Sequence, residues 1–320
     1  MAEVGSATSQ LRAPENSTQR MKNLYPHTKE QLEARAASGR DLRNSHLSDD
    51  YSRSLGYKSA PLGGSFIWRD VMHIVVRTWG ISWIERGGFS IRWRRPLYDA
   101  DEVQIRWTPV RDVEGAPRTD YEVVNAEGTV CVLGWASLPH SKPTAPSLSD
   151  FPITSKPAVL PKAEEWDKLV GRSLATEPTD MAHVAPMVRA GKFDADPLSP
   201  EGRLLLSYEP LRDVDPAIRE AKIALPWQLG GGLGGLDTSG VNYLMQTSGT
   251  FQCFNFARLE DMLDMRSRVT SAHERNDSKY LIIEHLLVAN DRTPVILKRW
   301  DHLIDYARAR KEPHTSAARK

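Results

Sequence analysis

Alternating apolar and polar residues mark the middle of the first half of the chain as strand-forming. Residues 89–95 (FSIRWRR) and residues 102–107 (EVQIRW) each alternate an aromatic or aliphatic residue with a polar one. A period of two is typical of half-buried antiparallel strands. Two further runs, YEVVN and TVCVLGWASL, flank the turn AEG at 126–128, which predicts a hairpin. Together these runs predict four consecutive antiparallel strands.

A wide apolar arc in residues 65–80 (SFIWRDVMHIVVRTWG) predicts a mostly buried helix ahead of these strands. Ser65 can cap its start, and Gly80 stands where a helix would end. Residues 25–62 are polar and helix-prone. One buried helix followed by consecutive antiparallel strands is an α+β layout, whose natural packing is a sheet curled round the helix.

The second half repeats a spacing found in the first. The same four residue types recur 165 residues apart, as Asn125, Val130, Trp135 and Leu138 and then as Asn290, Val295, Trp300 and Leu303. We therefore expect two copies of one fold. Strands are expected at 265–272 and 279–290, and the central helix of the second copy either in 214–224 or near 239–247.

The composition of segments between these regions predicts the domain boundaries. Residues 140–162 are rich in Pro and Ser without any period, which indicates a linker. We expect one domain at 23–139 and another at 163–311. Polar residues at 1–22 predict a disordered N-terminal arm, and those at 312–320 a flexible tail. No apolar run approaches the ~20 residues of a membrane span, and no apolar signal-peptide core is seen, so we expect a cytoplasmic protein.

Composition and charge exclude several classes of partner. The 320 residues are 40% hydrophobic and 26% charged, with 42 basic and 41 acidic residues, which fits a globular chain with a sizeable core. A net charge of +1 offers no excess of basic residues to bind nucleic acid or an anionic membrane. Cys131 and Cys253 form neither a disulfide framework nor a metal-binding pair, and we interpret both as buried thiols in a reducing compartment.

Two motifs in the first half carry a resemblance to a known family. The first is Asp41-Leu-Arg-Asn-Ser-His46, followed by Asp50, Tyr51, Gly56 and Tyr57, and the second is Arg95-Pro96-Leu97-Tyr98-Asp99-Ala100-Asp101. They resemble the signatures of the MaoC-like acyl dehydratases, or (R)-enoyl thioester hydratases, with Ala100 in place of a glycine. The second half, which ends WDHLIDYARAR, is similar to the C-terminal halves of tandem members.

The resemblance implies a double hotdog, in which two antiparallel sheets each curl round a central helix. It also implies a hydro-lyase that hydrates an enoyl group or dehydrates a 3-hydroxyacyl group on coenzyme A or a carrier protein. In this interpretation His46 is the general acid and base, and Asp41 is its partner on one water. The N–H groups of Gly63 and Gly64, ahead of the helix, bind the enolate oxygen. No cofactor or metal is expected beyond the coenzyme A or phosphopantetheine of the substrate.

Substrate contacts are predicted at four further residues: Tyr57, Trp79, Arg94 and Arg95. The arginines could hold a phosphate of the carrier group, although a solvated strand face is the plainer interpretation. Trp79 could line an apolar acyl tunnel, although core packing also explains the five tryptophans of this region. His73 and His285, each among apolar residues, are interpreted as core histidines.

Departures from the family pattern keep other functions open. Arg43-Asn44 stands where the family has Asn-Pro, Gly63-Gly64 stands where it has His-Gly, and the acid–base motif lies in the first half only. The same pocket could therefore serve an isomerase, a cyclase or a thioesterase, or the chain could be a silent acyl-binding partner subunit. It could act as a monomer of two hotdogs or as a homodimer. Residues 230–235 fit GxGxxG literally but lack the flanking strand and helix of a nucleotide loop. We interpret them as a flexible loop that could serve as a lid over a site.

Overall fold

The structure, a computed structural model, describes residues 11–21, 48–155, 166–180, 223–224 and 245–305. Two α-helices are described, α2 (Asp49–Ser54) and α3 (Gly64–Arg86), with 3-10 turns at Leu148–Asp150 and Trp166–Leu169. The strands of the first half are β1 (Ser17–Arg20), β2 (Gly88–Trp93), β3 (Glu102–Trp107), β4 (Arg111–Val113), β5 (Ala116–Asn125) and β6 (Val130–Ser137). Those of the second half are β7 (Glu177–Asp180), β8 (Ile223–Ala224), β9 (Met245–Cys253), β10 (Ala257–Arg258), β11 (Met262–Arg275), β12 (Ser278–Ala289) and β13 (Thr293–Asp305).

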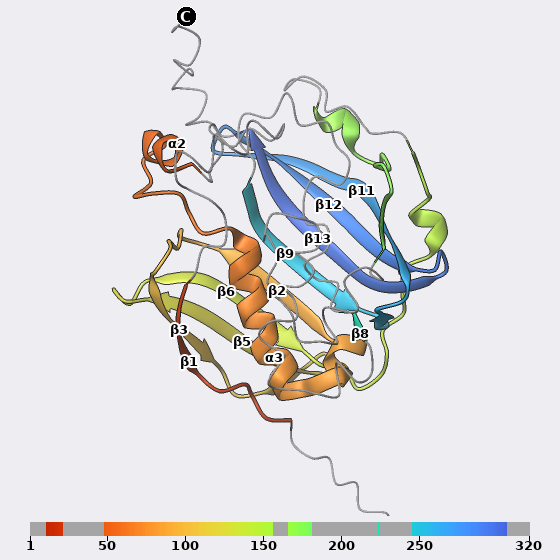
Figure 1. The fold of residues 1–320 in the computed structure, drawn as a ribbon, viewed down its shortest axis with the longest axis horizontal. Helices are drawn as coiled ribbons and strands as arrows, with labels where there is room; N and C mark the ends of the chain where they lie inside the picture. Colours follow the sequence, from red (N-terminus) through yellow and green to blue (C-terminus); the bar gives the residue numbers. More distant parts are fainter. Residues whose placement is uncertain (1–10, 22–47, 156–165, 181–222, 225–244, 306–320) are drawn as a thin grey trace, which may run out of the picture.

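Eleven strands form one antiparallel sheet in the order β1-β3-β5-β6-β2-β9-β13-β12-β11-β7, with β4 paired to β5 (Figure 1). The two halves join where β2 pairs with β9, through Phe89 opposite Phe251 and Ile91 opposite Gly249. The expected two separate sheets are therefore corrected to one continuous sheet across both halves. A small second sheet pairs β8 with β10.

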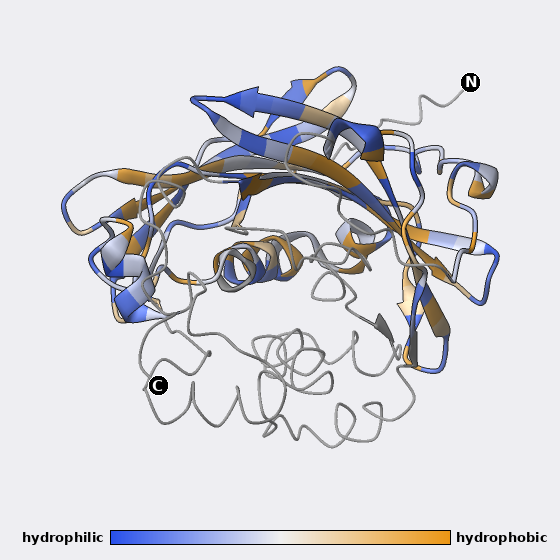
Figure 2. Ribbon diagram, turned by 90° about the horizontal axis from the view of Figure 1, so that it is seen from above, coloured by the Kyte–Doolittle hydropathy of each residue, from blue (hydrophilic) through white to orange (hydrophobic). Residues whose placement is uncertain are grey.

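The helix α3 lies against the concave face of this sheet, which we call the inner face (Figure 2). It is the buried helix that the apolar arc predicted: Val71, Val75 and Trp83 are each 0% exposed. It begins one residue before the predicted start, because the N-cap is Gly63, which has no side chain, and not Ser65. The helical conformation breaks at Gly80, as predicted, but it resumes and continues to Arg86.

The predicted strands of the first half are present, and the structure adds two. Residues 102–107 form β3, the run at 89–95 overlaps β2 over residues 89–93, and the hairpin at 126–128 joins β5 to β6. The short strand β4 was not predicted. Nor was β1, which pairs with β3, and Met21 after it is only 2% exposed, so the expected disordered arm over 1–22 is wrong for these residues.

The two halves repeat one strand order about the β2–β9 junction. Reading outwards, the first half runs β2-β6-β5-β3-β1 and the second runs β9-β13-β12-β11-β7. The expected duplication of one fold is therefore present in the sheet. The expected central helix of the second half falls largely outside the described residues, although 223–224 form β8 rather than a helix.

Each half has a β-bulge at the equivalent place, and the two bulges show which residues of the halves correspond. Val123 pairs with Val132 beside one bulge, and Leu287 pairs with Ile296 beside the other. This sets a displacement of 164 residues in both strands (287 − 123 and 296 − 132). The displacement of 165 inferred from the sequence is one residue too long.

The predicted linker crosses the outer face of the second half. The part at 140–155 is described and includes Phe151, which is 1% exposed and packs with Phe254, Leu286 and Val288. The segment joins β6 to the second half, as expected of a connection, but it also contributes to the core.

Candidate active site

The first turn of α3 is the part of the predicted site that the structure describes. Gly63, the N-cap, is buried and has no side chain that could bond to the first turn, and no acidic residue lies in that turn. The N–H groups of a helix start have no partner within the helix and carry the positive end of its dipole. This arrangement suits an oxygen that develops negative charge.

The segment ahead of α3 is held by backbone hydrogen bonds to the second motif. Leu62 N donates to Leu97 O at 2.7 Å, and Lys58 N donates to the Tyr98 hydroxyl at 3.2 Å. On its other side, Ala60 N donates to Asp49 Oδ1 at 2.8 Å. The Arg-Pro-Leu-Tyr stretch therefore positions the start of the helix, which gives this motif a structural role.

Aromatic residues of both halves meet beside the first turn. A Cβ on Gly64 would lie 2.6 Å from the Trp93 ring, so glycine is needed there for the indole to approach. Trp93 stacks on Trp300 of the second half, with ring centroids 5.8 Å apart, and Trp68 of α3 lies 6.0 Å from Trp300. The helix start therefore rests on the junction between the halves.

The other predicted substrate residues lie in different surroundings. Tyr57 is half-buried and packs with Tyr51, Leu55 and Leu303. Trp79 is 7% exposed, and its Nε1 donates to Arg12 O at 2.9 Å, a position of ordinary core packing. Arg94 and Arg95 follow the end of β2 and are exposed. Asp41 and His46 fall outside the described residues.

The cysteines and His73 occupy positions that fit the core interpretation. Cys131 is 0% and Cys253 3% exposed, and both thiols are free. Burial raises the pKa of Cys131 and raises that of Cys253 to about 12. Both thiols are therefore protonated near neutral pH and unreactive. His73 is 2% exposed within α3.

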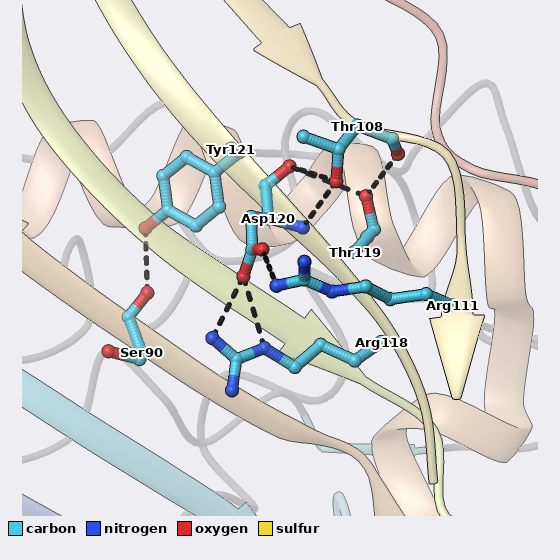
Figure 3. A network of polar contacts seen from close by, with 7 residues as sticks. All are labelled: Ser90, Thr108, Arg111, Arg118, Thr119, Asp120 and Tyr121. Atoms are coloured by element: carbon cyan, nitrogen blue, oxygen red, sulfur yellow. Dashed lines mark hydrogen bonds and ion pairs between the residues drawn. The ribbon is translucent and has the colours of Figure 1, made fainter. Parts of the chain in front are cut away.

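A polar network lies on the outer face of the first half, where β4 meets β5 (Figure 3). Asp120 accepts from the guanidinium groups of Arg111 and Arg118, the second at 2.8 Å. Arg111 also lines a hollow of about 970 Å³, together with Arg86 and His140. Arg86 is the last residue of α3, and a helix of this length spans roughly 30 Å, so the hollow is remote from the helix start.

Neither a metal-binding group of side chains nor a membrane-spanning helix is found among the described residues. Within the parts of the chain that the structure describes, no group of three or more His, Cys, Asp or Glu side chains is arranged to hold a metal ion. Among the same residues, no helix has the length and apolarity to cross a membrane.

Comparison with known proteins identifies similar solved structures only. No protein-family model matches the chain, and no curated protein matches it. A MaoC domain protein named as a dehydratase, from Chloroflexus aurantiacus, is 15% identical with a TM-score of 0.45, and the match covers 91% of this chain and 95% of that one. A conserved hypothetical protein of Mycobacterium tuberculosis, described as a double hotdog fold, is 13% identical with a TM-score of 0.44, and the match covers 90% and 96%.

A third similar structure is named as a thioesterase. The acyl-CoA thioesterase II TesB2 of Mycobacterium marinum is 11% identical with a TM-score of 0.40, and the match covers 76% of this chain and 89% of that one. The similar structures thus include MaoC-like dehydratases, thioesterases and a double hotdog protein.

Proposed function

We propose that the chain is a tandem hotdog hydro-lyase that acts on an acyl thioester of coenzyme A or a carrier protein. The observation that carries the proposal is the start of α3, whose N-cap Gly63 is buried and has no capping side chain, at the junction of two halves with the same strand order. Its N–H groups can donate hydrogen bonds to the oxygen of a thioester carbonyl as it becomes an enolate. The resemblance of the motifs around Asp41 and His46 supplies the acid–base pair.

In the proposed reaction the thioester oxygen accepts hydrogen bonds from the first turn of α3, next to Gly63 and Gly64. His46, with Asp41 as its partner, takes a proton from water as the water oxygen bonds to the β-carbon. The electrons of the double bond move onto the thioester oxygen and return when the α-carbon takes the proton from His46. Dehydration follows the same steps in reverse.

The test is mass spectrometry of the purified chain with a panel of enoyl and 3-hydroxyacyl thioesters. We expect the gain or loss of one water, reduced about a hundredfold or more in His46→Ala, since one acid–base group contributes that much to rate. His140→Ala is the matched control, because the His140 side chain is 67% exposed and remote from the helix start. Hydration that persists at full rate in His46→Ala would contradict the proposed role.

The same panel separates the alternatives. A product of unchanged mass but shifted double bond indicates an isomerase, and a ring product indicates a cyclase. An unchanged panel combined with tight binding of the acyl thioester indicates a silent acyl-binding subunit. Arg94→Ala and Arg95→Ala are expected to raise KM and leave kcat unchanged if these exposed arginines bind the carrier's phosphate.

A further inference from the structure

Three neighbouring residues across β11, β12 and β13 are polar, whereas the corresponding row across β3, β5 and β6 is largely apolar. The displacement of 164 residues aligns Tyr121 with His285 and Gly134 with Lys298. On the next strand of each half, Trp107 pairs with Tyr121 and Ser267 pairs with His285. Within each half the three residues lie directly opposite one another on neighbouring strands.

In the first half this row is ordinary core. The rings of Trp107 and Tyr121 lie 5.1 Å apart, and the Tyr121 hydroxyl donates to Ser90 O at 2.9 Å. Gly134 leaves room for Tyr121, since a Cβ there would lie 2.7 Å from the phenol oxygen. The fold therefore accepts a largely apolar row at this place.

In the second half the row lies on the inner face and is buried. Lys298 is two residues before Trp300 on β13, so both side chains point to the same face, and Trp300 contacts Trp68 of α3. Ser267 is 3% exposed, His285 1% and Lys298 1%. Burying three polar side chains costs free energy unless they are satisfied, and the first half shows that the fold does not need them.

One nitrogen of the His285 ring has a hydrogen-bond partner and the other has none among the described residues. Its Nδ1 lies 2.7 Å from Ser267 Oγ, while its Nε2 has no hydrogen-bond partner among the residues that the structure describes. A buried nitrogen without a partner costs about 1–3 kcal/mol. Either atom of this pair can be the donor. When the Ser267 hydroxyl accepts from Nδ1–H, the ring is in the tautomer that leaves a lone pair on Nε2.

The charge state of the row suits a base. Burial, with Lys298 and His302 nearby, lowers the pKa of His285 well below its usual value, so the ring is neutral at pH 7. Burial also lowers the pKa of Lys298 to about 7. The row therefore combines a neutral imidazole with an amine that is partly protonated near neutral pH.

We propose that Ser267, His285 and Lys298 form a second catalytic site, which hydrolyses acyl thioesters by activating water at His285 Nε2. This inference rests on the proposed acyl thioester substrate but not on the hydro-lyase reaction. His285 is the catalytic base, Ser267 is a positioning residue that fixes its tautomer, and protonated Lys298 stabilises the oxyanion.

The hydrolytic step balances without any added reagent. The water oxygen bonds to the thioester carbonyl carbon, one water proton passes to His285 Nε2, and the carbonyl oxygen becomes an oxyanion. When the oxyanion collapses, the carbon–sulfur bond breaks and the thiolate takes the proton from His285. The products are the carboxylic acid and the free thiol.

Saturated acyl-CoA thioesters test this activity separately, because they have no double bond to hydrate. We expect the full chain to release free thiol from them, with the rate falling about a hundredfold or more in His285→Gln. Tyr121→Phe is the matched control, since it removes a buried polar group at the corresponding position of the first half. His46→Ala is expected to keep thiol release while it loses hydration of enoyl thioesters.

Ser267→Ala tests whether the Ser267 hydroxyl positions the His285 ring. We expect kcat to fall about tenfold with KM unchanged and a shifted pH profile, both restored in Ser267→Thr, which retains the hydroxyl. If His285→Gln does not fold, His285→Asn replaces it, because the smaller amide fits within the space of the imidazole and removes the base. Absence of thiol release by the wild type, or release within threefold of wild type in a folded His285 variant, would overturn the proposal.

Discussion

Ala100 occupies a backbone conformation that suits glycine. Its φ is 64°, in the left-handed region that costs a non-glycine residue about 1–3 kcal/mol, and its N–H is fixed by Met21 O at 2.9 Å. We expect Ala100→Gly to raise the free energy of unfolding in urea by about 0.5–1 kcal/mol, since relief of strain exceeds the entropy that glycine adds to the unfolded chain. Ala116→Gly, in a strand without positive φ, should instead destabilise by about 0.5–1 kcal/mol.

A shift of one residue explains what the sequence repeat could and could not predict. Trp135 and Trp300 were matched as equivalents, yet Trp135 is only half-buried with the Arg118 guanidinium 4.8 Å above its ring, whereas Trp300 is 0% exposed. A one-residue slip moves a strand side chain to the opposite face. The alternation of Ile296, Lys298 and Trp300 did place a lysine on an apolar face, and this signal could have identified the polar row. Ser267, the third residue of this row, has no comparable signal in the sequence.

Gly80 divides α3 and supplies the prediction at the scale of elements. Its φ of 63° and ψ of −155° are in a region open essentially to glycine alone. An added Cβ there meets nothing within 4 Å, so the cost of Gly80→Ala is in the backbone. We expect a loss of about 1–3 kcal/mol in urea unfolding, against a change within about 0.5 kcal/mol for exposed Thr78→Ala. Equal stability of the two variants would show that the kink relaxes without cost.

Burial with a period of two made β3 predictable from its sequence. β3 has this pattern, with Val103, Ile105 and Trp107 buried between exposed residues. β1, with the sequence STQR, has no apolar alternation and forms because β3 offers an unpaired edge. The start of α3 was displaced because Gly63 caps it through backbone conformation alone. Asp41 and His46, the proposed acid–base pair, remain predictions from their motif.

At the scale of the molecule, the halves share one sheet and one core. Phe89 stacks on Phe251 with centroids 5.9 Å apart, and Phe251 meets Trp300 edge-on at 4.9 Å. Sequence patterns predicted the two copies but not their junction, because the pairing of β2 with β9 depends on residues about 160 apart. A joint of this kind places residues of either half beside the start of α3.

This junction predicts that the two halves unfold together. In calorimetry we expect a single transition with equal calorimetric and van't Hoff enthalpies. Phe251→Ala should cost about 3–5 kcal/mol and lower the single melting temperature by roughly 6–20 °C, because its ring packs against both halves. Ile153→Ala, at a side chain 61% exposed, should leave the melting temperature unchanged. Two resolved transitions, with only the second-half transition shifted by Phe251→Ala, would show instead that the β2–β9 pairing does not couple the halves.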